Sequence, residues 1–317
     1  MEIIIEITGL TKKYGNYAAV DNLNISINKG EVFGLLGPNG AGKSTAILML
    51  LGLTEPHSGT ITVCGIDPVR HPIEVKKKVG YLPEDVGFYD DYSGLENLIY
   101  TANLNGIQKS EAINKAKQLL NKVGLSEEIN KKVGKYSRGM RQRLGLADVL
   151  IKNPEVIILD EPTLGIDPSG VKNFLELIVE LSYKNKITVL FSSHHLHQVQ
   201  QVCDRVGLFV KGKLLAEGNI QNLAKKLFSD NTIHIEGEIE HVNIKSVPDL
   251  TQKLKSIKGV NDVKINGTLF SINTEKDITS VISKYIIDAG YGLVTLSKKE
   301  FGLDDIYHKY FEGVERE

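Results

Sequence analysis

The sequence predicts an α/β domain followed by a smaller α+β domain, and three observations support this. Short apolar runs of strand length occur at residues 32–36, 156–159 and 188–193, which is typical of buried strands in an α/β sheet. After residue 224 the pattern changes to short strands and helices in alternation. The length of 317 residues, with 41% hydrophobic content, is enough for two cores. We place the domains at residues 1–224 and 225–317.

A glycine-rich loop follows the first predicted strand. Residues 37–45 fit the pattern G-x-x-x-x-G-K-[ST], and an apolar helix is predicted over residues 45–53. Such a loop points backbone N–H groups at a polyphosphate, and the helix adds the positive end of its dipole. Lys43 then reaches the outer phosphates, and the Ser44 hydroxyl is available to Mg²⁺. The predicted phosphate contacts are Gly37, Pro38, Asn39, Gly40, Ala41, Gly42, Lys43, Ser44 and Thr45.

Two adjacent acids, Asp160 and Glu161, end the second predicted strand. Successive strand residues point to opposite faces, so the two carboxylates can take different roles. We expect Asp160 to hold Mg²⁺ and Glu161 to orient and deprotonate an attacking water. A turn cap before Pro162 is the alternative, but the phosphate loop favours the catalytic interpretation. The two motifs together predict binding and hydrolysis of ATP.

With these motifs the chain resembles the ABC-type ATPases, the cytoplasmic motors of ABC transporters, over residues 2–223. The family has a P-loop domain with a mixed sheet. Tyr14 matches the aromatic residue that stacks on adenine in that family. Residues 136–143 resemble the family's signature loop, with Ser137 and Gly139 in the matching positions. The resemblance therefore implies two further contacts with nucleotide.

The resemblance also implies a homodimeric sandwich, because the family uses the signature loop on the nucleotide of the other copy. Arg138 and Met140 replace the usual glycine and glutamine. Ser137 is still a good N-cap, so its hydroxyl and free helix N–H groups can face a γ-phosphate. Residues 164–167 match the loop that crosses the dimer axis, which places Asp167 at the nucleotide. A plain helix cap is the alternative for Asp167.

The third predicted strand is followed by His194, which matches the family's switch histidine. The resemblance implies that His194 contacts the γ-phosphate and helps to position the water polarised by Glu161. His195 and His197 lie close by. We prefer solvated positions at a helix start for these two over a metal cluster, because no cysteine or second histidine pair has ligand spacing.

Glu84 stands where most members of the family place a glutamine. Its carboxylate can ligate Mg²⁺ and contact the nucleotide, but beside phosphate oxygens it adds repulsion. Its role stays open between a metal ligand and a reporter of permease closure. This form of the motif resembles ATPases that serve separate export permeases, in the drug-export, sodium-export and nitrous-oxide-reductase maturation branches.

The family inserts a helical lobe, which we expect at about residues 85–150, with an amphipathic helix over residues 110–123. In the family this lobe carries the signature at one end and receives the coupling helix of the permease at the other. The aromatic loop at residues 87–92 would lie near that groove. Exposed aromatics among acids suit a protein contact. Aromatics tucked under their own loop are the alternative.

The last part of the chain predicts the order β-α-β-β-α-β, the ferredoxin-like split unit. Asn266 and Gly267 mark a two-residue hairpin turn. A short helix at residues 303–307 resembles the end of many export-type ATPases. This domain can bind a regulator, aid dimerisation or stabilise the fold, and the sequence does not choose. The predicted elements are strands at 232–236, 260–265, 268–272 and 292–296, and helices at 249–257 and 277–289.

Composition and charge exclude several other classes. No apolar run approaches the roughly 20 residues that cross a bilayer, and no secretory signal is readable at the start. A net charge of −1 offers no footprint for nucleic acid. Lysine clusters at 76–78 and 131–132 suit solvated faces, with lipid headgroups beside a permease as the alternative. Cys64 and Cys203 form no disulfide framework, which agrees with a reducing compartment.

We therefore expect an ATP- and Mg²⁺-dependent homodimeric motor, cytoplasmic and held on the inner face of the cell membrane by a separate permease, with export as the direction. A soluble ABC ATPase in a non-transport role is the alternative, for which two cassettes or a long coiled-coil insertion would be expected. A non-catalytic nucleotide sensor is disfavoured because Glu161 and His194 are both retained. The transported substrate contacts the permease and cannot be predicted from this chain.

Overall fold

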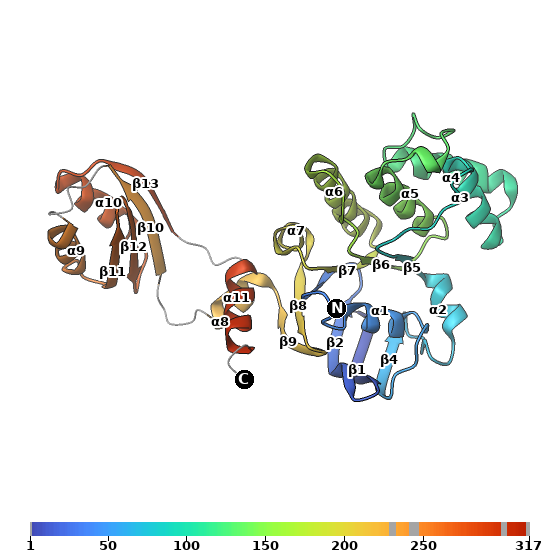
Figure 1. The fold of residues 1–317 in the computed structure, drawn as a ribbon, viewed down its shortest axis with the longest axis horizontal. Coiled ribbons are helices and arrows are strands. Elements are labelled where there is room, and N and C mark those ends of the chain that lie inside the picture. Colours follow the sequence, from blue (N-terminus) through green and yellow to red (C-terminus); the bar gives the residue numbers. More distant parts are fainter. Residues whose placement is uncertain (1, 228–232, 241–246, 299–302, 315–317) are drawn as a thin grey trace. The chain divides into compact units, whose positions relative to one another are not determined.

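The computed structural model describes residues 2–227, 233–240, 247–298 and 303–314. The chain divides into two compact units, Met1–Ile220 and Gln221–Glu317, and each has its own hydrophobic core. In Figure 1 the first unit runs from blue to yellow and the second continues to red. Within the described ranges, no helix combines the length and the apolar content needed to cross a bilayer.

A mostly parallel six-stranded sheet organises the first unit. Its strand order is β5-β6-β7-β3-β8-β9, and β9 alone runs antiparallel to its neighbour. The three strands β3, β6 and β7 are buried along their whole length, which explains their largely apolar sequences. The strands are β3 (Val32–Leu36), β5 (Val79–Leu82), β6 (Val156–Asp160), β7 (Thr188–Ser193), β8 (Arg205–Val210) and β9 (Lys213–Gly218).

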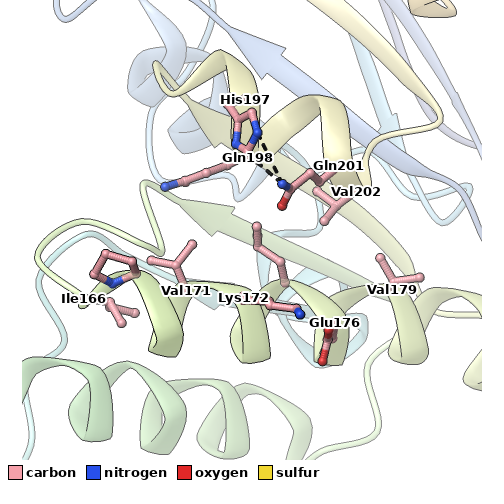
Figure 2. A pocket seen from close by; sticks show the side chains of 11 residues that line it. Ile166, Val171, Lys172, Glu176, Val179, His197, Gln198, Gln201 and Val202 are labelled. Carbon is pink, nitrogen blue, oxygen red and sulfur yellow. Dashed lines mark hydrogen bonds between the residues drawn. The ribbon is translucent and has the colours of Figure 1, made fainter.

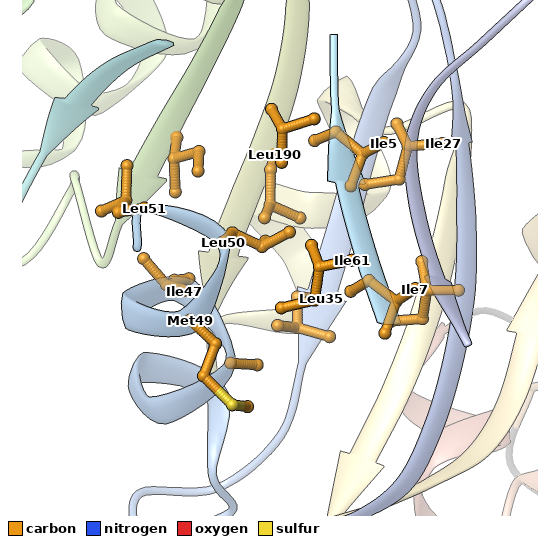
Figure 3. Close-up of a cluster of buried hydrophobic side chains, with 14 of the residues drawn as sticks. Ile5, Ile7, Ile27, Leu35, Ile47, Met49, Leu50, Leu51, Ile61 and Leu190 are labelled. Carbon is orange, nitrogen blue, oxygen red and sulfur yellow. The ribbon is translucent and has the colours of Figure 1, made fainter. Parts of the chain in front are cut away.

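A second, antiparallel sheet packs over the first with helix α1 (Lys43–Leu50) between them. Its order is β2-β1-β4. Figure 3 shows the shared core, in which side chains of both sheets and of α1 face one another. The α/β class and the mixed sheet are thereby confirmed. The strands are β1 (Ile3–Tyr14), β2 (Tyr17–Asn28) and β4 (Ser58–Val63), and the labelled core residues include Ile5, Ile27, Leu35, Ile47, Ile61 and Leu190.

The helical lobe consists of α3, α4 and α5, which pack on one another beside β5 (Figure 1). A full capping box starts α3, because the Ser93 side chain accepts from the Glu96 N–H while the Glu96 carboxylate accepts from the Ser93 N–H. The other helices of this unit are α2 (Pro72–Lys78), α3 (Gly94–Leu104), α4 (Lys109–Lys122), α5 (Arg138–Leu150), α6 (Pro168–Asn185) and α7 (Leu196–Val202), with a 3₁₀ turn at Val133–Lys135. Helix α8 (Ile220–Leu227) begins at the last residue of the first unit and continues into the second.

The second unit contains a four-stranded antiparallel sheet in the order β11-β12-β10-β13, and its elements from β10 to β13 follow the order β-α-β-β-α-β. Leu250, Leu254, Ile282 and Ile286 of its helices pack into the core of this unit. The final helix is longer than the predicted one. The elements are β10 (Ile233–Ile239), α9 (Val247–Lys255), β11 (Val260–Asn266), β12 (Leu269–Thr274), α10 (Thr279–Asp288), β13 (Leu293–Lys298) and α11 (Leu303–Val314). Thr232, the expected start of the first strand, lies outside the described residues.

The predicted hairpin turn in this unit is shifted by one residue. Asn266 still pairs with Leu269, so the two-residue loop is Gly267–Thr268 rather than Asn266–Gly267. Gly267 has φ +63°, the left-handed value that the first position of such a loop requires and that glycine adopts without strain. Asn266 therefore ends the strand instead of opening the turn.

Candidate active site

The order of the parallel strands brings three segments together at one edge of the sheet. β3 pairs with β7, and β7 pairs with β6, all in parallel. The segments that follow these strands must therefore emerge side by side. The segments after β3 and β6, together with residues of β1 and β2 and of the segment after β5, line a hollow of about 330 Å³. The residues that line it are Tyr14, Tyr17, Ala19, Pro38, Asn39, Gly40, Ala41, Gly42, Lys43, Ser44, Thr45, Glu84, Asp160 and Glu161.

Close backbone packing shapes the phosphate loop at the floor of this hollow. A Cβ on Gly37 would lie 2.0 Å from the Phe209 carbonyl oxygen, and a Cβ on Gly42 would lie 2.0 Å from that of Ala19. Gly42 also has φ +106° and directly precedes α1. The helix consequently begins at Lys43, two residues before the predicted start, because the left-handed glycine ends the loop there.

The Lys43 ammonium lies at the centre of the loop. Its Nζ donates to the carbonyl oxygens of Gly37 at 2.6 Å and Pro38 at 3.3 Å, and lies 3.5 Å from Glu161 Oε1. The side chain is only 6% exposed. A buried cation is stable only with such partners. The loop therefore fixes a positive charge beside the backbone N–H groups that can bind an anion.

A left-handed turn separates Asp160 from Glu161. Glu161 has φ +46°, and its N–H donates to the Ser192 carbonyl oxygen at 3.0 Å. This conformation costs a non-glycine residue roughly 1 kcal/mol, so the contact with β7 stabilises it. Strand alternation, the expected reason for the divergence of the two carboxylates, is not the cause. The chain has already left the strand at Glu161.

Asp160 offers the oxygen that a divalent cation requires. The side chain is 6% exposed, and in the described part of the chain its Oδ1 is buried without a hydrogen-bond partner. Such an atom is costly unless a ligand satisfies it. Ser44 lines the same hollow. A carboxylate and a hydroxyl are hard oxygen ligands of the kind that Mg²⁺ prefers, so these residues fit the metal.

His194 holds the Glu161 carboxylate from the side of β7. Its Nδ1 lies 2.9 Å from Glu161 Oε1, and the Ser193 hydroxyl lies 3.4 Å from Oε2. Both carboxylate oxygens are thus fixed. The neighbouring His195 ring lies 4.0 Å from that of His194, and burial, followed by the charge of His194, lowers the pKa of His195. His195 is therefore favoured in its neutral form, whereas His197 lies farther along on α7 and is exposed.

Two tyrosines, not one, border the hollow. Tyr14 is exposed, with the Lys12 ammonium 5.4 Å from its ring centre. Tyr17 is paired with Tyr14 across the hairpin, and its hydroxyl donates to the Gly40 carbonyl oxygen at 3.2 Å. Sequence reasoning missed Tyr17. The Gly15-Asn16 turn could have indicated it, because a two-residue turn places Tyr17 opposite Tyr14 in the hairpin.

Glu84 lines the hollow with an exposed side chain, while its backbone is fixed to the helical lobe. The Gln142 side chain of α5 donates to the Glu84 carbonyl oxygen at 3.1 Å. Gln142 itself is buried, at 2% exposure. The position of the Glu84 segment thus depends on α5.

Ser137, Gly139 and Asp167 lie outside the hollow. Ser137 caps α5 by accepting from the Met140 N–H, as predicted, and Asp167 caps α6 by accepting from the Gly170 N–H at 3.0 Å. Asp167 is therefore a helix cap in its own chain, and its contact with nucleotide stays a prediction. A Cβ on Gly139 would lie 3.3 Å from the Ile166 side chain. The signature loop and the segment before α6 thus form one continuous surface.

Helix α7 is tied to the segment that follows Glu161. The Thr163 hydroxyl lies 2.5 Å from Gln198 Oε1. Beside this bond, a hollow of about 660 Å³ separates α6 from α7 (Figure 2). Its walls carry mainly aliphatic side chains of α6 facing His197, Gln198 and Gln201 of α7. Sequence reasoning found neither the bond nor the hollow, because thirty-five residues separate Thr163 from Gln198.

Three exposed tyrosines cluster on the helical lobe, and we call them the tyrosine surface: Tyr89, Tyr92 and Tyr100. The ring centre of Tyr89 lies 5.3 Å from that of Tyr92 and 5.2 Å from that of Tyr100. The buried Asn97 side chain bonds both the N–H and the carbonyl of Tyr89, which fixes the loop. Arg141 of α5 pairs with Asp90 at 2.6 Å. Tyr100 meets Tyr89 edge-on and Tyr92 is tilted against it, and all three rings remain exposed. Of the aromatic residues in the predicted loop, only Phe88 is half-buried.

Comparison with known proteins agrees with this geometry. The family model described as ABC transporter matches residues 20–164. A bacitracin transport ATP-binding protein of Bacillus licheniformis is 37% identical over 99% of both chains. The chain belongs to the ABC transporter family. It is an ATP-binding, ATP-hydrolysing member, and the match to the Bacillus licheniformis protein also extends over the second unit.

Further relatives of this ABC transporter ATPase support the same assignment. A linearmycin resistance ATP-binding protein of Bacillus subtilis is 33% identical over 89% of this chain and 90% of its own length. Among solved structures, cbiO1 of Clostridium perfringens, part of the cbiONQ ABC transporter complex, has a TM-score of 0.65 at 27% identity. The matched region covers 73% of this chain and 92% of the cbiO1 chain.

The two glycines of the phosphate loop provide a test of its geometry. We expect Gly42→Ala to reduce the rise in melting temperature caused by ATP to near zero, because the new Cβ clashes with the Ala19 carbonyl and φ +106° excludes alanine. Gly40→Ala is the matched control, since φ is +78° but nothing lies within 4 Å. Backbone strain alone, about 1 kcal/mol, should lower the melting temperature of the free protein there and leave most of the ATP-induced rise. Equal effects of the two variants would contradict the clash.

Proposed function

We propose that this chain binds and hydrolyses ATP as a homodimer and thereby drives a separate membrane permease. The observation that carries the proposal is the Glu161 carboxylate. It is buried, lies 2.9 Å from His194 and 3.5 Å from Lys43, and adjoins an unpartnered Asp160 oxygen above a phosphate loop. These are the positions that phosphoryl transfer to water requires.

In this proposal Glu161 is the general base. Its carboxylate accepts the proton of a water that attacks the γ-phosphorus, while His194 holds the carboxylate at Oε1 and orients it. Lys43 is released from the Gly37 and Pro38 carbonyls when phosphate oxygens replace them as acceptors. The lysine then stabilises the charge that develops on the transferred group. Tyr14 and Tyr17 border the hollow where the adenine would stack.

We propose that Ser44 and Asp160 hold Mg²⁺ when it is bound. The metal would neutralise the phosphate charge, a standard contribution to phosphoryl transfer. Glu84 lies in the same hollow, but its carboxylate is exposed, unlike that of Asp160. We therefore assign Glu84 to sensing closure of the lobe rather than to the metal, since its backbone is bound to Gln142 of α5.

The position of the signature loop supports the proposed homodimer. Ser137, Gly139 and Asp167 are absent from the lining of the hollow in their own chain. Ser137 presents a hydroxyl and the N terminus of a thirteen-residue helix, which attract phosphate. In the proposed dimer these residues complete the nucleotide site of the second copy.

We propose the tyrosine surface as the contact for the permease. Aromatic residues are enriched at protein interfaces, and this loop is fixed by Asn97 and Arg141, so little conformational entropy is lost on docking. The chain would then be held on the inner face of the cell membrane. Export is the direction that suits a relative named for linearmycin resistance and another named for bacitracin transport.

The general base is tested by Glu161→Gln. Turnover should fall at least ~10²-fold while ATP affinity is retained, because the amide cannot accept the proton but keeps the shape. Single-turnover hydrolysis and calorimetry measure the two quantities. Glu155→Gln is the control, since this glutamate immediately precedes β6 and pairs with Lys78. Unchanged turnover in Glu161→Gln would remove the residue from this role.

The dimer is tested at Ser137 in the Glu161→Gln background. Ser137→Arg should abolish ATP-driven dimerisation in light scattering, because a bulky cation enters the shared surface, while monomer ATP binding persists. Ser137→Ala is the control: it removes the same N-cap, worth about 1 kcal/mol, without adding bulk. Both variants should melt at similar temperatures. Dimerisation of the arginine variant to the level of the parent would exclude the sandwich.

Glu84→Gln separates the two roles of that carboxylate. If Glu84 senses closure, the Mg²⁺ concentration for half-maximal hydrolysis should stay constant and only permease-stimulated turnover should fall. A titration of Mg²⁺ with and without reconstituted permease measures both. A clear rise in the required Mg²⁺ would instead make Glu84 a metal ligand, because an anionic oxygen is lost from a hard cation.

A further inference from the structure

A basic hollow of about 580 Å³ lies on the first unit, apart from the nucleotide site. Three segments distant in sequence form it: helix α2, the region from the end of α3 into α4, and the loop after α5. We call it the lysine hollow. Its charged residues are Lys76, Lys77, Lys115, Lys152 and Glu111. Four lysines thus share one concave surface with a single acid.

Within the described residues, Lys76 and Lys77 differ from the neighbouring Lys78 in lacking an acidic partner. Lys78, the next residue on α2, pairs with Glu155 at 2.9 Å. For Lys76 and Lys77, no ion pair with a carboxylate occurs within the described ranges. Lys115 interacts with Glu111 only through longer-range attraction, which burial outweighs. Lys152 has Asp148 as an acidic neighbour, but burial outweighs this attraction too. The hollow therefore keeps an excess of positive charge.

Burial makes this excess charge costly. The Lys152 ammonium is half-buried and donates to the Lys76 carbonyl oxygen at 2.5 Å. Removal from water lowers the pKa of Lys152 and of Lys115. An anion bound between these lysines would replace the lost hydration and stabilise their charged forms. Phosphate suits the site because its oxygens accept from several ammonium groups at once.

The rim of the lysine hollow is apolar. Ile73 is 70% exposed and Leu104 is 71% exposed, and both border the lysines. Leu104 lies four residues after Tyr100 on α3, so the two side chains share one face of that helix. The hollow therefore opens on the same side of α3 as the tyrosine surface. A ligand with a phosphate and an apolar tail matches both features.

We propose that the lysine hollow binds the phosphate headgroup of an anionic phospholipid, with Ile73 and Leu104 against the start of the acyl region. The orientation toward a membrane rests on the proposed permease contact at the tyrosine surface. The site itself does not, since it is formed by one chain alone. Headgroup binding would add a second attachment to the bilayer beside the permease.

The experiment is co-sedimentation of the full chain with vesicles of phosphatidylglycerol or of phosphatidylcholine. The native chain should prefer the anionic vesicles. Lys77→Glu and Lys115→Glu should each reduce that binding at least about fivefold, since one lysine near an anionic surface contributes about that factor. Lys117→Glu is the matched control, because it makes the same charge change on an exposed position of α4 outside the hollow. Basal ATP hydrolysis should be unchanged in all three.

Two further arms distinguish a lipid from free phosphate. Ile73→Ser should weaken binding to phosphatidylglycerol vesicles, and millimolar inorganic phosphate should not displace the chain. Displacement by phosphate together with no effect of Ile73→Ser would overturn the lipid assignment in favour of a free anion. An equal loss in Lys117→Glu, or no preference for anionic vesicles, would overturn the site itself. No permease is present in the assay, so these outcomes leave the proposed permease contact untouched.

Discussion

The hydrogen bond from the Glu161 N–H to the Ser192 carbonyl oxygen holds the end of β6 against the end of β7. The active site is built around this contact. It stabilises the left-handed backbone of Glu161, which turns the carboxylate toward His194 and leaves Asp160 on the strand. The parallel pairing of β7 with β3 then places both acids beside the phosphate loop. A helix or a loop in place of any of these strands would separate the groups.

The elements nearest this site were the most predictable from sequence. The strands at 32–36 and 188–193 have the predicted bounds, because they are short runs buried on both faces and bounded by turn residues. Prediction was weaker where backbone conformation decides. The left-handed Gly42 makes α1 begin before the apolar pattern from which the helix was predicted. Gly267 shifts the hairpin turn by one residue.

Contacts between distant segments were beyond the reach of sequence reasoning. Tyr17, the bond from Thr163 to Gln198 and the lysine hollow all depend on which elements the fold places side by side. Lys76 had only its charged neighbours as a signal, which indicated a solvated face. Its environment is set instead by Lys152, which is far along the chain and donates to its carbonyl oxygen. Such partners are determined by the packing of the lobe on the sheet.

The N-terminal part of α5 contacts two other segments, and its N-cap lies at the proposed dimer surface. Ser137 caps the helix at the proposed dimer surface. Arg141 pairs with Asp90, which lies between Tyr89 and Tyr92 in sequence, and the Gln142 side chain donates to the Glu84 carbonyl oxygen. A helix is stiff over this length, so these residues of α5 keep fixed positions relative to one another. A shift of this end of α5 would therefore move the contacts with Asp90 and Glu84 together. In the proposed dimer, the nucleotide hollow, the signature loop and the tyrosine surface would then be connected through one helix.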